Sequence, residues 1–250
     1  MSHSFAIKLP LTTLQEVDST NNYAMARINE GSVTSGQAWL ALYQTSGKGQ
    51  RGKPWQSNPG ENIMMSIALK PNGLLLADQF MLSSSVALGS YDFVKNYAGD
   101  ATRIKWSNDI YINDKKAGGI LIENLIRGNR WMYAVAGIGI NLNQESFSPD
   151  VPNPVSLCQI TGRKHDLLKM AEELYNCIMN RISLMHPKDY EQLLEEYNRR
   201  LYRRGEKQWF LSKRGKFEAM IKGVENDGKL VLENDGKLTS VSFGEVSFII

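Results

Sequence analysis

The sequence predicts an α+β fold: a mixed, largely antiparallel sheet backed by helices, followed by a small β-barrel at the carboxyl end. Three observations support this prediction. Short apolar stretches between residues 38 and 139 are separated by turn signals, as in hairpin-linked strands. Stretches with helical periodicity lie at 78–97 and within 166–203. After Gly205 only short strand-like stretches remain. We expect the helices against one face of the first sheet.

The first predicted element is a helix from Asn21 to about Asn29. The segment Asp18-Ser19-Thr20 precedes it, and short polar side chains of this kind cap the free amides of a first helical turn. This prediction places a polar cluster at the start of the helix.

Strands and hairpins follow. The predicted strands lie at 38–44, 62–69, 102–106, 109–112, 119–126 and 131–139, with a helix at 78–97 between the second and the third. Turn signals at Asn113-Asp114 and Gly128-Asn129 join the last three strands. Two amphipathic helices, at 166–185 and 187–203, complete this part of the chain.

The carboxyl-terminal part contains a short internal repeat. The hexapeptide Glu-Asn-Asp-Gly-Lys-Leu occurs at 225–230 and again at 233–238, and each Asp-Gly pair is a tight-turn signal. A meander of about 45 residues with such turns is expected to close into a small barrel of the SH3-like type. We therefore predict two domains, 1–204 and 205–250.

Composition indicates a soluble, cytoplasmic protein. The chain has 250 residues, of which 42% are hydrophobic, enough for one large core and a small satellite domain. It lacks a run of about 18 apolar residues, and its first ten residues lack the charged-then-apolar pattern of a secretory signal. No membrane partner is expected.

The cysteines, the histidines and the net charge exclude several site types. Cys158 and Cys177 match neither a metal-ligand spacing nor a disulfide framework, so free thiols are expected. The histidines, His3, His165 and His186, are too scattered to suggest a metal site or a catalytic triad. A net charge of +3 is too small to argue for nucleic acid by itself.

The glycine-rich segment Gly47–Lys53, followed by Trp55, is the most informative motif. Its three glycines let the backbone approach a ligand closely, and its three cations can neutralise phosphate or carboxylate. It lacks the ending of a Walker loop and the spacing of a dinucleotide-binding loop. On this segment alone, a nucleotide-handling loop and a flexible solvated loop are equally good interpretations.

Three further segments combine glycines or aromatic residues with polar side chains. They are Lys105–Asp109, Lys116–Glu123 and Gly137–Asn143. In the first, polar groups around a tryptophan suit a ligand with a polar head and an apolar body. In the third, glycines at a strand end leave room for a flat ligand beside Asn141. Each segment taken alone is also compatible with a plain core strand.

The order of the motifs resolves this ambiguity. Ser19-Thr20-Asn21, Gln44 with the loop 47–55, Lys-Trp-x-Asn-Asp, Lys-x-x-Gly-Ile-Leu and Gly-Ile-Gly-Ile-Asn together closely resemble the biotin–protein ligase family. The resemblance spans about residues 14–160, and the carboxyl-terminal barrel also matches that family's architecture. It implies a catalytic domain related to that of class II aminoacyl-tRNA synthetases.

The resemblance also implies roles for individual residues. Lys116 matches the catalytic lysine that contacts the biotin carboxylate and the reacting phosphate. The implied biotin-binding residues are Ser19, Thr20, Asn21, Gln44, Gly47, Lys48, Trp106, Asp109, Lys116 and Gly119. The implied ATP-binding residues are Lys48, Gln50, Arg51, Lys53, Trp55, Lys105, Asn108 and Asn141. Trp55 and Trp106 are expected as apolar walls of the biotin pocket.

The glycine-rich loop departs from the family's pattern. The family usually has arginine at the positions of Lys48, Gln50 and Lys53, and lysine lacks the two-pronged donor geometry of arginine. Gln50 also removes one cation, so the loop either holds the activated intermediate less tightly or relies on Arg51 to compensate. Ser107 replaces the usual proline, which should relax the strand end without removing a ligand.

The implied reaction has two steps. Biotin and ATP first give biotinyl-adenylate and pyrophosphate, with Mg²⁺ held through the ATP phosphates and no certain protein ligand for the metal. A lysine of a biotin carboxyl carrier protein or domain then attacks the adenylate and AMP leaves. A closed loop protects the intermediate from water between the two steps.

Two alternative functions stay open. A lipoate–protein ligase shares the fold and the chemistry, although the Lys-Trp-x-Asn-Asp segment favours biotin. A non-catalytic sensor that binds DNA belongs to a different class. Because the Ser-Thr-Asn motif begins at residue 19, we expect no amino-terminal helix-turn-helix domain and no direct operator binding.

One basic group is not explained by these motifs. It consists of Arg199, Arg200, Arg203, Arg204, Lys207, Lys213, Arg214 and Lys216. A solvated helix end with an interdomain hinge is the first interpretation, a dock for an acidic carrier domain the second, and nucleic acid the third. The sequence leaves open whether the protein forms a homodimer and which carboxylase supplies the acceptor.

Overall fold

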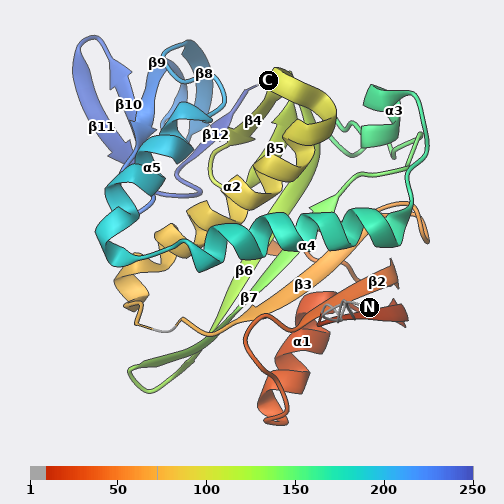
Figure 1. Cartoon of the computed structure of the whole chain (residues 1–250). Helices are drawn as coiled ribbons and strands as arrows, with labels where there is room; N and C mark the ends of the chain where they lie inside the picture. The colour runs from red at the N-terminus through yellow and green to blue at the C-terminus, as the bar shows by residue number, and fades with distance from the viewer. Residues whose placement is uncertain (1–9, 72, 250) are drawn as a thin grey trace, which may run out of the picture.

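The computed structural model describes residues 10–71 and 73–249 (Figure 1). His3 and the rest of the amino-terminal segment lie outside the described residues. Within these two ranges, no helix is both long and apolar enough to cross a membrane.

A seven-stranded sheet forms the centre of the structure. Its strand order is β1-β2-β3-β7-β6-β5-β4. The strands are β1 (Leu11–Val17), β2 (Ala38–Gln44), β3 (Ile63–Leu69), β4 (Thr102–Lys105), β5 (Asp109–Ile112), β6 (Lys115–Arg127) and β7 (Arg130–Ile140). Only β1 and β2 are parallel among the described pairs, whereas the others are antiparallel. The predicted mixed, largely antiparallel sheet is confirmed.

Strand β1 is an element that the sequence analysis missed. Its apolar residues Leu11, Leu14 and Val17 are spaced by three, so the alternation that reveals a half-buried strand is absent. The strand forms because it pairs with β2 at the edge of the sheet, from Leu11 opposite Ala38 to Val17 opposite Gln44. Pairing with a distant segment therefore stabilises a strand that the local pattern did not predict.

The described residues form five α-helices. They are α1 (Thr20–Asn29), α2 (Gln79–Ala98), α3 (Leu157–Thr161), α4 (Leu167–Ser183) and α5 (Tyr190–Arg199). Helices α2 and α4 lie side by side over one face, where Leu40 and Ile67 belong to the main core (Figure 1). Helix α1 packs on the opposite face against Trp39 and Ala68. The expectation of helices on one face was therefore wrong for α1.

The side taken by α1 follows from the alternation of strand side chains. Successive residues of a strand point to opposite faces, so Trp39 and Leu40 enter different cores. Ala24 and Ile28 of α1 fill the smaller core beside Trp39. This arrangement places the beginning of α1, with its polar residues, directly over the sheet.

Arg181 of α4 joins α2 and α5 through two carboxylates. Its Nε lies 2.6 Å from Oδ2 of Asp92, and its Nη1 lies 2.8 Å from Oε2 of Glu196. The hydrogen bond from Arg181 is the main cause that holds the pKa of Glu196 below its usual value of 4.5. Because the folded-state pKa is the lower one, this contribution to stability is present above about pH 4.5 and is lost as pH falls through the folded-state value.

We therefore expect Glu196→Gln to lower the free energy of unfolding at pH 7 by on the order of 1 kcal/mol. The difference from the wild type should shrink as the pH is lowered to about 3.5. Urea unfolding at both pH values measures this effect. Glu195→Gln is the matched control, because Glu195 pairs with Arg199 at the surface, where an ion pair contributes little. An equal loss for the two variants, or a difference independent of pH, would contradict the assignment.

Helix α5 ends at Arg199, four residues before the predicted end at Arg203. The chain after the helix pairs with β4: the amide of Ile104 donates to the carbonyl of Arg200, and the amide of Tyr202 donates to the carbonyl of Ile104. Arg203 has a φ of 55°, which no α-helix accommodates. The pairing with β4 thus overrides the helical periodicity of the sequence.

The carboxyl-terminal segment forms a separate five-stranded sheet. Its order is β11-β10-β9-β8-β12. The strands are β8 (Lys207–Ser212), β9 (Gly215–Val224), β10 (Leu230–Asn234), β11 (Lys237–Val241) and β12 (Val246–Phe248). The two copies of the repeated hexapeptide place Asp227-Gly228 between β9 and β10 and Asp235-Gly236 between β10 and β11. Both glycines have a positive φ, so the predicted tight turns are confirmed.

The two sheets meet at the turn after β4. The indole Nε1 of Trp106 donates to the carbonyl of Gly228 at 2.9 Å, and its ring packs edge-on against Phe243. A Cβ at Gly228 would lie 2.7 Å from the ring of Phe80 on α2. The first Asp-Gly turn therefore fits closely against the central part of the molecule.

Candidate functional site

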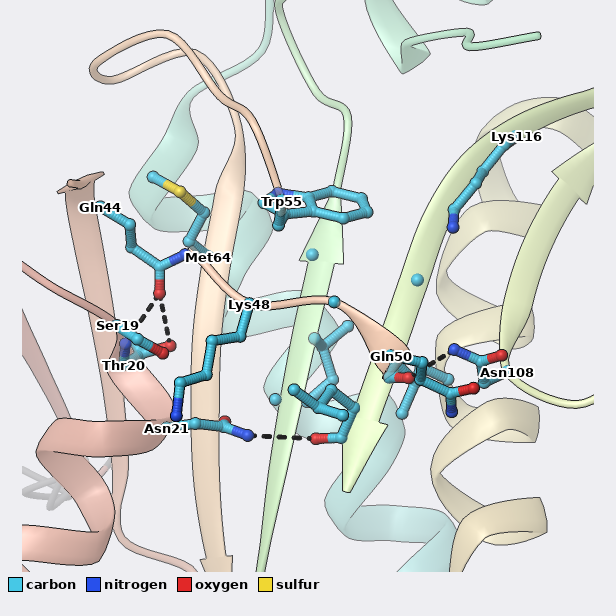
Figure 2. Close-up of a pocket in the computed structure, with 17 residues that line it drawn as sticks. Ser19, Thr20, Asn21, Gln44, Lys48, Gln50, Trp55, Met64, Asn108 and Lys116 are labelled. Carbon is cyan, nitrogen blue, oxygen red and sulfur yellow. Dashed lines mark hydrogen bonds between the residues drawn. The ribbon is translucent and has the colours of Figure 1, made fainter. Parts of the chain in front are cut away.

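A cavity with about 470 Å³ of space, counting the part that is open to solvent, lies on the face of the sheet that carries α1. Its walls come from α1, the glycine-rich loop, the end of β2 and strands β3, β6 and β7 (Figure 2). The lining residues are Ser19, Thr20, Asn21, Gln44, Lys48, Gly49, Gln50, Trp55, Met64, Asn108, Lys116, Gly119, Ile120, Leu121, Gly137, Ile138 and Gly139. Segments more than 100 residues apart in the sequence thus build one site.

Glycines on β6 and β7 make room for the ring of Trp55. A Cβ at Gly139 would lie 2.5 Å from this ring, and one at Gly119 would lie 3.2 Å from it. The ring of Trp55 therefore lies close against the sheet, and Figure 2 shows it over the strands between Gln44 and Lys116. Trp55 is thus a wall of the cavity. It also occupies the space over Gly139 in which the sequence analysis placed a flat ligand.

At the end of the cavity near α1, Thr20, Gln44 and Ser66 form a network of neutral hydrogen-bonding groups. Gln44 Oε1 accepts from the amide of Thr20 at 2.7 Å and from its hydroxyl at 3.0 Å. The hydroxyl of Ser66 lies 2.7 Å from Oγ1 of Thr20. Thr20 and Ser66 are buried, so their geometry is fixed by protein partners. This end suits a neutral polar ligand group.

Asn21 is held from both ends of its amide. Its Nδ2 donates to Oε2 of Glu123 at 2.7 Å, and its Oδ1 lies 2.6 Å from the hydroxyl of Ser66. A Cβ at Gly137 would lie only 2.3 Å from Oδ1 of Asn21. Asn21 therefore lines the cavity as predicted, but its polar atoms join α1 to β3 and β6.

Lys116 marks the opposite, cationic end of the cavity. Its Nζ lies 2.7 Å from Oδ1 of Asp109 and 5.7 Å from the centre of the Trp55 ring. Both charged side chains are less than a third exposed. Asp109 thus holds Lys116 close to Gly119, where a ligand carboxylate or phosphate can reach its charge.

Two residues of the glycine-rich loop enter the cavity in different ways. Lys48 reaches across to α1, where its ammonium donates to Oδ1 of Asn22 and lies 4.0 Å from Oε1 of Glu123 (Figure 2). Gln50 lies near Asn108, and its Oε1 is buried without a hydrogen-bond partner among the described residues. Asn108 itself donates to the carbonyl of Ile120 at 2.7 Å.

The structure brings ten of the predicted site residues to the wall of this cavity. These are Ser19, Thr20, Asn21, Gln44, Lys48, Gln50, Trp55, Asn108, Lys116 and Gly119. Gly47 and Asp109 do not line the cavity, but they lie next to residues that do. A Cβ at Gly47 would lie 2.9 Å from Nε2 of Gln44, and Asp109 forms an ion pair with Lys116. The remaining predicted residues, Arg51, Lys53, Lys105, Trp106 and Asn141, do not line it.

Two of these residues differ clearly from expectation. Trp106 is not a wall of the cavity, because its side chain points to the carboxyl-terminal sheet and is bonded to Gly228. Asn141 is buried, and its Nδ2 donates to the carbonyls of Lys116 and Val155 at 3.3 and 3.1 Å. The amide of Asn141 therefore fixes the backbone that carries Lys116.

The remaining three residues are cationic. Arg51 lies against Gly244 of the carboxyl-terminal sheet, 3.4 Å from its carbonyl oxygen, and Lys53 is exposed. The ammonium of Lys105 lies over the rings of Tyr111 and Phe248 at 4.9 and 4.8 Å. Burial lowers the pKa of Lys105, and the charges of Lys116 and Lys53 act in the same direction.

Several lining residues were not among the predicted site residues, although all except Met64 lie in the segments singled out from the sequence. They are Met64, Ile120, Leu121, Gly137, Ile138, Gly139 and, in the glycine-rich loop, Gly49. Ser66 and Glu123 were also missed, although they fix Asn21. Strand alternation could have found Ser66, since it shares a face with Met64, but only if the sheet order had been known. Among the described residues, no group of three or more His, Cys, Asp or Glu side chains could hold a metal ion.

Comparison with known families gives the decisive observation. The family model described as biotin/lipoate A/B protein ligase family matches residues 14–141, which is more than half of the chain. The chain belongs to this family. A second model, described as the biotin protein ligase C terminal domain, matches residues 210–249. The biotin/lipoate ligase match contains the whole seven-stranded sheet except the first residues of β1, and the second match covers most of the carboxyl-terminal sheet.

Curated members of the family resemble the chain over different lengths. The bifunctional ligase/repressor BirA of Bacillus spizizenii is 34% identical over 171 residues, which are 67% of this chain and 52% of that protein. The chain thus spans about half the length of the first curated relatives it matches. The biotin–[acetyl-CoA-carboxylase] ligase of Paracoccus denitrificans is 30% identical over 244 residues, 94% of this chain and 99% of that protein.

A solved structure of the family shares the architecture. The biotin protein ligase from Aquifex aeolicus, in complex with biotin and ATP, has a TM-score of 0.79 and 25% identity to the chain. The superposition covers 96% of this chain and 98% of that one. The α+β fold with its carboxyl-terminal sheet is therefore a shared feature of the family.

Proposed function

We propose that the chain is a biotin–protein ligase, which activates biotin with ATP and transfers it to a lysine of a biotin carboxyl carrier protein or domain. One observation carries this proposal. A single cavity has neutral hydrogen-bonding groups of Thr20 and Gln44 at one end and the ammonium of Lys116 at the other. Such a cavity suits a ligand with a neutral polar head, an apolar body and a carboxylate.

The cavity supports an orientation for biotin. The ureido group would lie at the end near Thr20 and Gln44, and the apolar body would lie along Trp55 and the glycines of β6 and β7. The carboxylate would then approach Lys116, whose fixed charge favours the negative charge that develops when the carboxylate attacks the α-phosphate of ATP. Met64 adds apolar surface beside this path.

ATP is proposed to bind beyond Lys116. The cations of the glycine-rich loop, Lys48, Arg51 and Lys53, would hold its phosphates after Lys48 leaves Asn22 and Glu123. Lys105 would be a further phosphate contact. Asn108 and Asp109 carry oxygen atoms of the kind that Mg²⁺ prefers, so Mg²⁺ held mainly by the ATP phosphates fits these residues. When bound, the metal would offset phosphate charge.

The transfer of biotin to the carrier lysine depends more on positioning the two reactants than on a reactive side chain of the enzyme. Once the adenylate has formed, the lysine amine of the carrier forms an amide bond to the acyl carbon and AMP leaves. Holding the two reactants together supplies a large part of such a rate. The glycine-rich loop, with Trp55 against the sheet, would exclude water from the mixed anhydride.

Biotin-dependent exchange of labelled pyrophosphate into ATP tests the first step. We expect exchange with biotin, and a mass increase of one biotin on a purified carrier domain when that domain is added. Folded protein that supports neither reaction would contradict the proposal. Lipoate in place of biotin is the necessary comparison, because the matching family model includes lipoate ligases. Exchange with lipoate and none with biotin would move the assignment to lipoate.

The contacts of the basic group 199–216 support its interpretation as a solvated helix end with an interdomain hinge rather than as a nucleic-acid surface. Several of its charges are engaged within the protein: Arg199 pairs with Glu195, Arg203 with Asp114, and Lys207 with Glu218. Lys216 lies over the ring of Trp209 at 4.5 Å. We propose an enzyme that does not act as a DNA-binding sensor.

The broader assignments complete the proposal. We propose a class II synthetase-like catalytic domain over residues 1–204 and an SH3-like domain over residues 205–250. The edge strands β11 and β12 of the second sheet would then close the barrel. We also propose a cytoplasmic location, with a biotin carboxyl carrier protein or domain as the acceptor.

A further inference from the structure

A second cavity adjoins the first one. It has about 440 Å³ of space, counting the part that is open to solvent, and lies between β6 and the first turns of α2. Gln50, Asn108 and Ile120 line both cavities. The second cavity lies on the face of the sheet that carries α2, opposite to the first, so the two share these residues at the edge of β6 beyond Gly119, where β5 no longer pairs with it. The proposed function uses only the first cavity for biotin.

The second cavity is electrically neutral. Both ammonium groups of the first cavity, those of Lys48 and Lys116, are missing from its wall, and none of its described lining residues carries a charge. A cationic ligand would be repelled by the lysines of the first cavity. An amine approaching the acyl group would meet less repulsion through the second cavity.

The walls of the second cavity suit an aliphatic chain that ends in a hydrogen-bond donor. Phe80, Ala87 and Ile122 form apolar surface, on which the methylene stem of a lysine can lie. Where the cavities meet, the buried Oε1 of Gln50 is an acceptor without a hydrogen-bond partner among the described residues. An amine there would supply the missing donor.

We infer that the second cavity receives the side chain of the acceptor lysine and leads its amine to the acyl group in the first cavity. This inference rests on the proposed ligase function and adds the path of the nucleophile. Burial between apolar walls favours the neutral amine, which is the nucleophilic form. The amine nitrogen forms the bond to the acyl carbon and the bond from that carbon to the phosphate oxygen breaks. AMP leaves with the electron pair, and the nitrogen loses a proton to water.

Narrowing the second cavity should slow the transfer step alone. Ser83 lies on α2 in the wall of the second cavity and does not line the first. We expect Ser83→Leu to lower the single-turnover rate of transfer from preformed biotinyl-adenylate to a purified carrier domain by about tenfold or more. Biotin-dependent pyrophosphate exchange should stay within about twofold of the wild type.

Two controls make the test specific. Lys95→Leu introduces the same side chain at a partly exposed position of α2 that lines neither cavity, and we expect both rates to stay unchanged. Hydroxylamine, which is much smaller than a lysine side chain, should capture the adenylate on Ser83→Leu at the wild-type rate. Ile122→Phe narrows the same cavity from β6 and replaces Ser83→Leu if that variant does not fold.

The outcomes separate this inference from the proposed function. Wild-type protein without biotin-dependent exchange would overturn the function itself. Normal exchange together with normal transfer in folded Ser83→Leu and Ile122→Phe would overturn only the lysine path. Equal losses in exchange and transfer would also overturn it, because they would show a general distortion of the site.

Discussion

Replacing Lys116 by alanine is expected to lower the rate of biotin-dependent pyrophosphate exchange by about 10²–10³-fold, the usual effect of removing one group that stabilises developing charge. Lys116 is the cation that the structure holds at the end of the cavity, 2.7 Å from Asp109. The substitution removes a charge that both the biotin carboxylate and the reacting phosphate would meet. The exchange rate at saturating biotin and ATP measures the effect.

Lys115 provides a matched control for this substitution. It precedes Lys116 on β6, but its side chain is exposed and does not line the cavity. We expect Lys115→Ala to keep the wild-type exchange rate, and Lys116→Arg to recover part of the loss because it keeps the charge. Similar rates for Lys115→Ala and Lys116→Ala would show that position 116 has no special role. Thermal unfolding of each variant checks that the loss of the Asp109 contact has not unfolded the protein.

Gly89→Ala is expected to destabilise the protein by about 1–3 kcal/mol, although alanine normally favours a helix over glycine. The reason is the close approach of α2 and α4. A Cβ at Gly89 would lie 2.6 Å from Cα of Ile178 and 3.0 Å from the carbonyl oxygen of Cys177. Both contacts are to backbone atoms, which cannot move away without displacing α4.

The melting temperature measures this effect, at about 2–4 °C for each kcal/mol in a chain of this size. Lys95→Ala on the same helix is the control, because its side chain is partly exposed and should change the melting temperature little. A Gly89→Ala variant as stable as the wild type would mean that the two helices are farther apart than the structure shows.

Much of the architecture was predictable because its signals are local. The start of α1, the alternating or apolar strands and the Asp-Gly turns at 228 and 236 depend on neighbours within a few residues. The expected side-chain cap of α1 was wrong, because Ser19, the residue before the helix, makes no capping hydrogen bond with its side chain. The structure places these elements within a few residues of their predicted positions. Short-range patterns were therefore enough to predict the α+β class and the mixed, largely antiparallel sheet.

The residues of the candidate site were predictable only in part. Motif order identified Thr20, Gln44 and Lys116, and the structure brings them to one cavity. Motif order did not show that the polar atoms of Asn21 are hydrogen-bonded to Ser66 and Glu123. These contacts join residues 45 and 102 positions apart in the sequence, and no local pattern encodes them.

Two orientations show what only the tertiary structure decided. Trp106 belongs to a predicted site motif, yet its indole turns to Gly228 because the carboxyl-terminal sheet offers a carbonyl acceptor there. Helix α1 was predicted correctly as a helix, but it packs on the face opposite to α2 and α4. The sequence by itself determined the type and order of the elements and most of the site's residue types. The direction of each side chain and the face taken by each helix depended on long-range packing, because partners distant in the sequence supply those contacts.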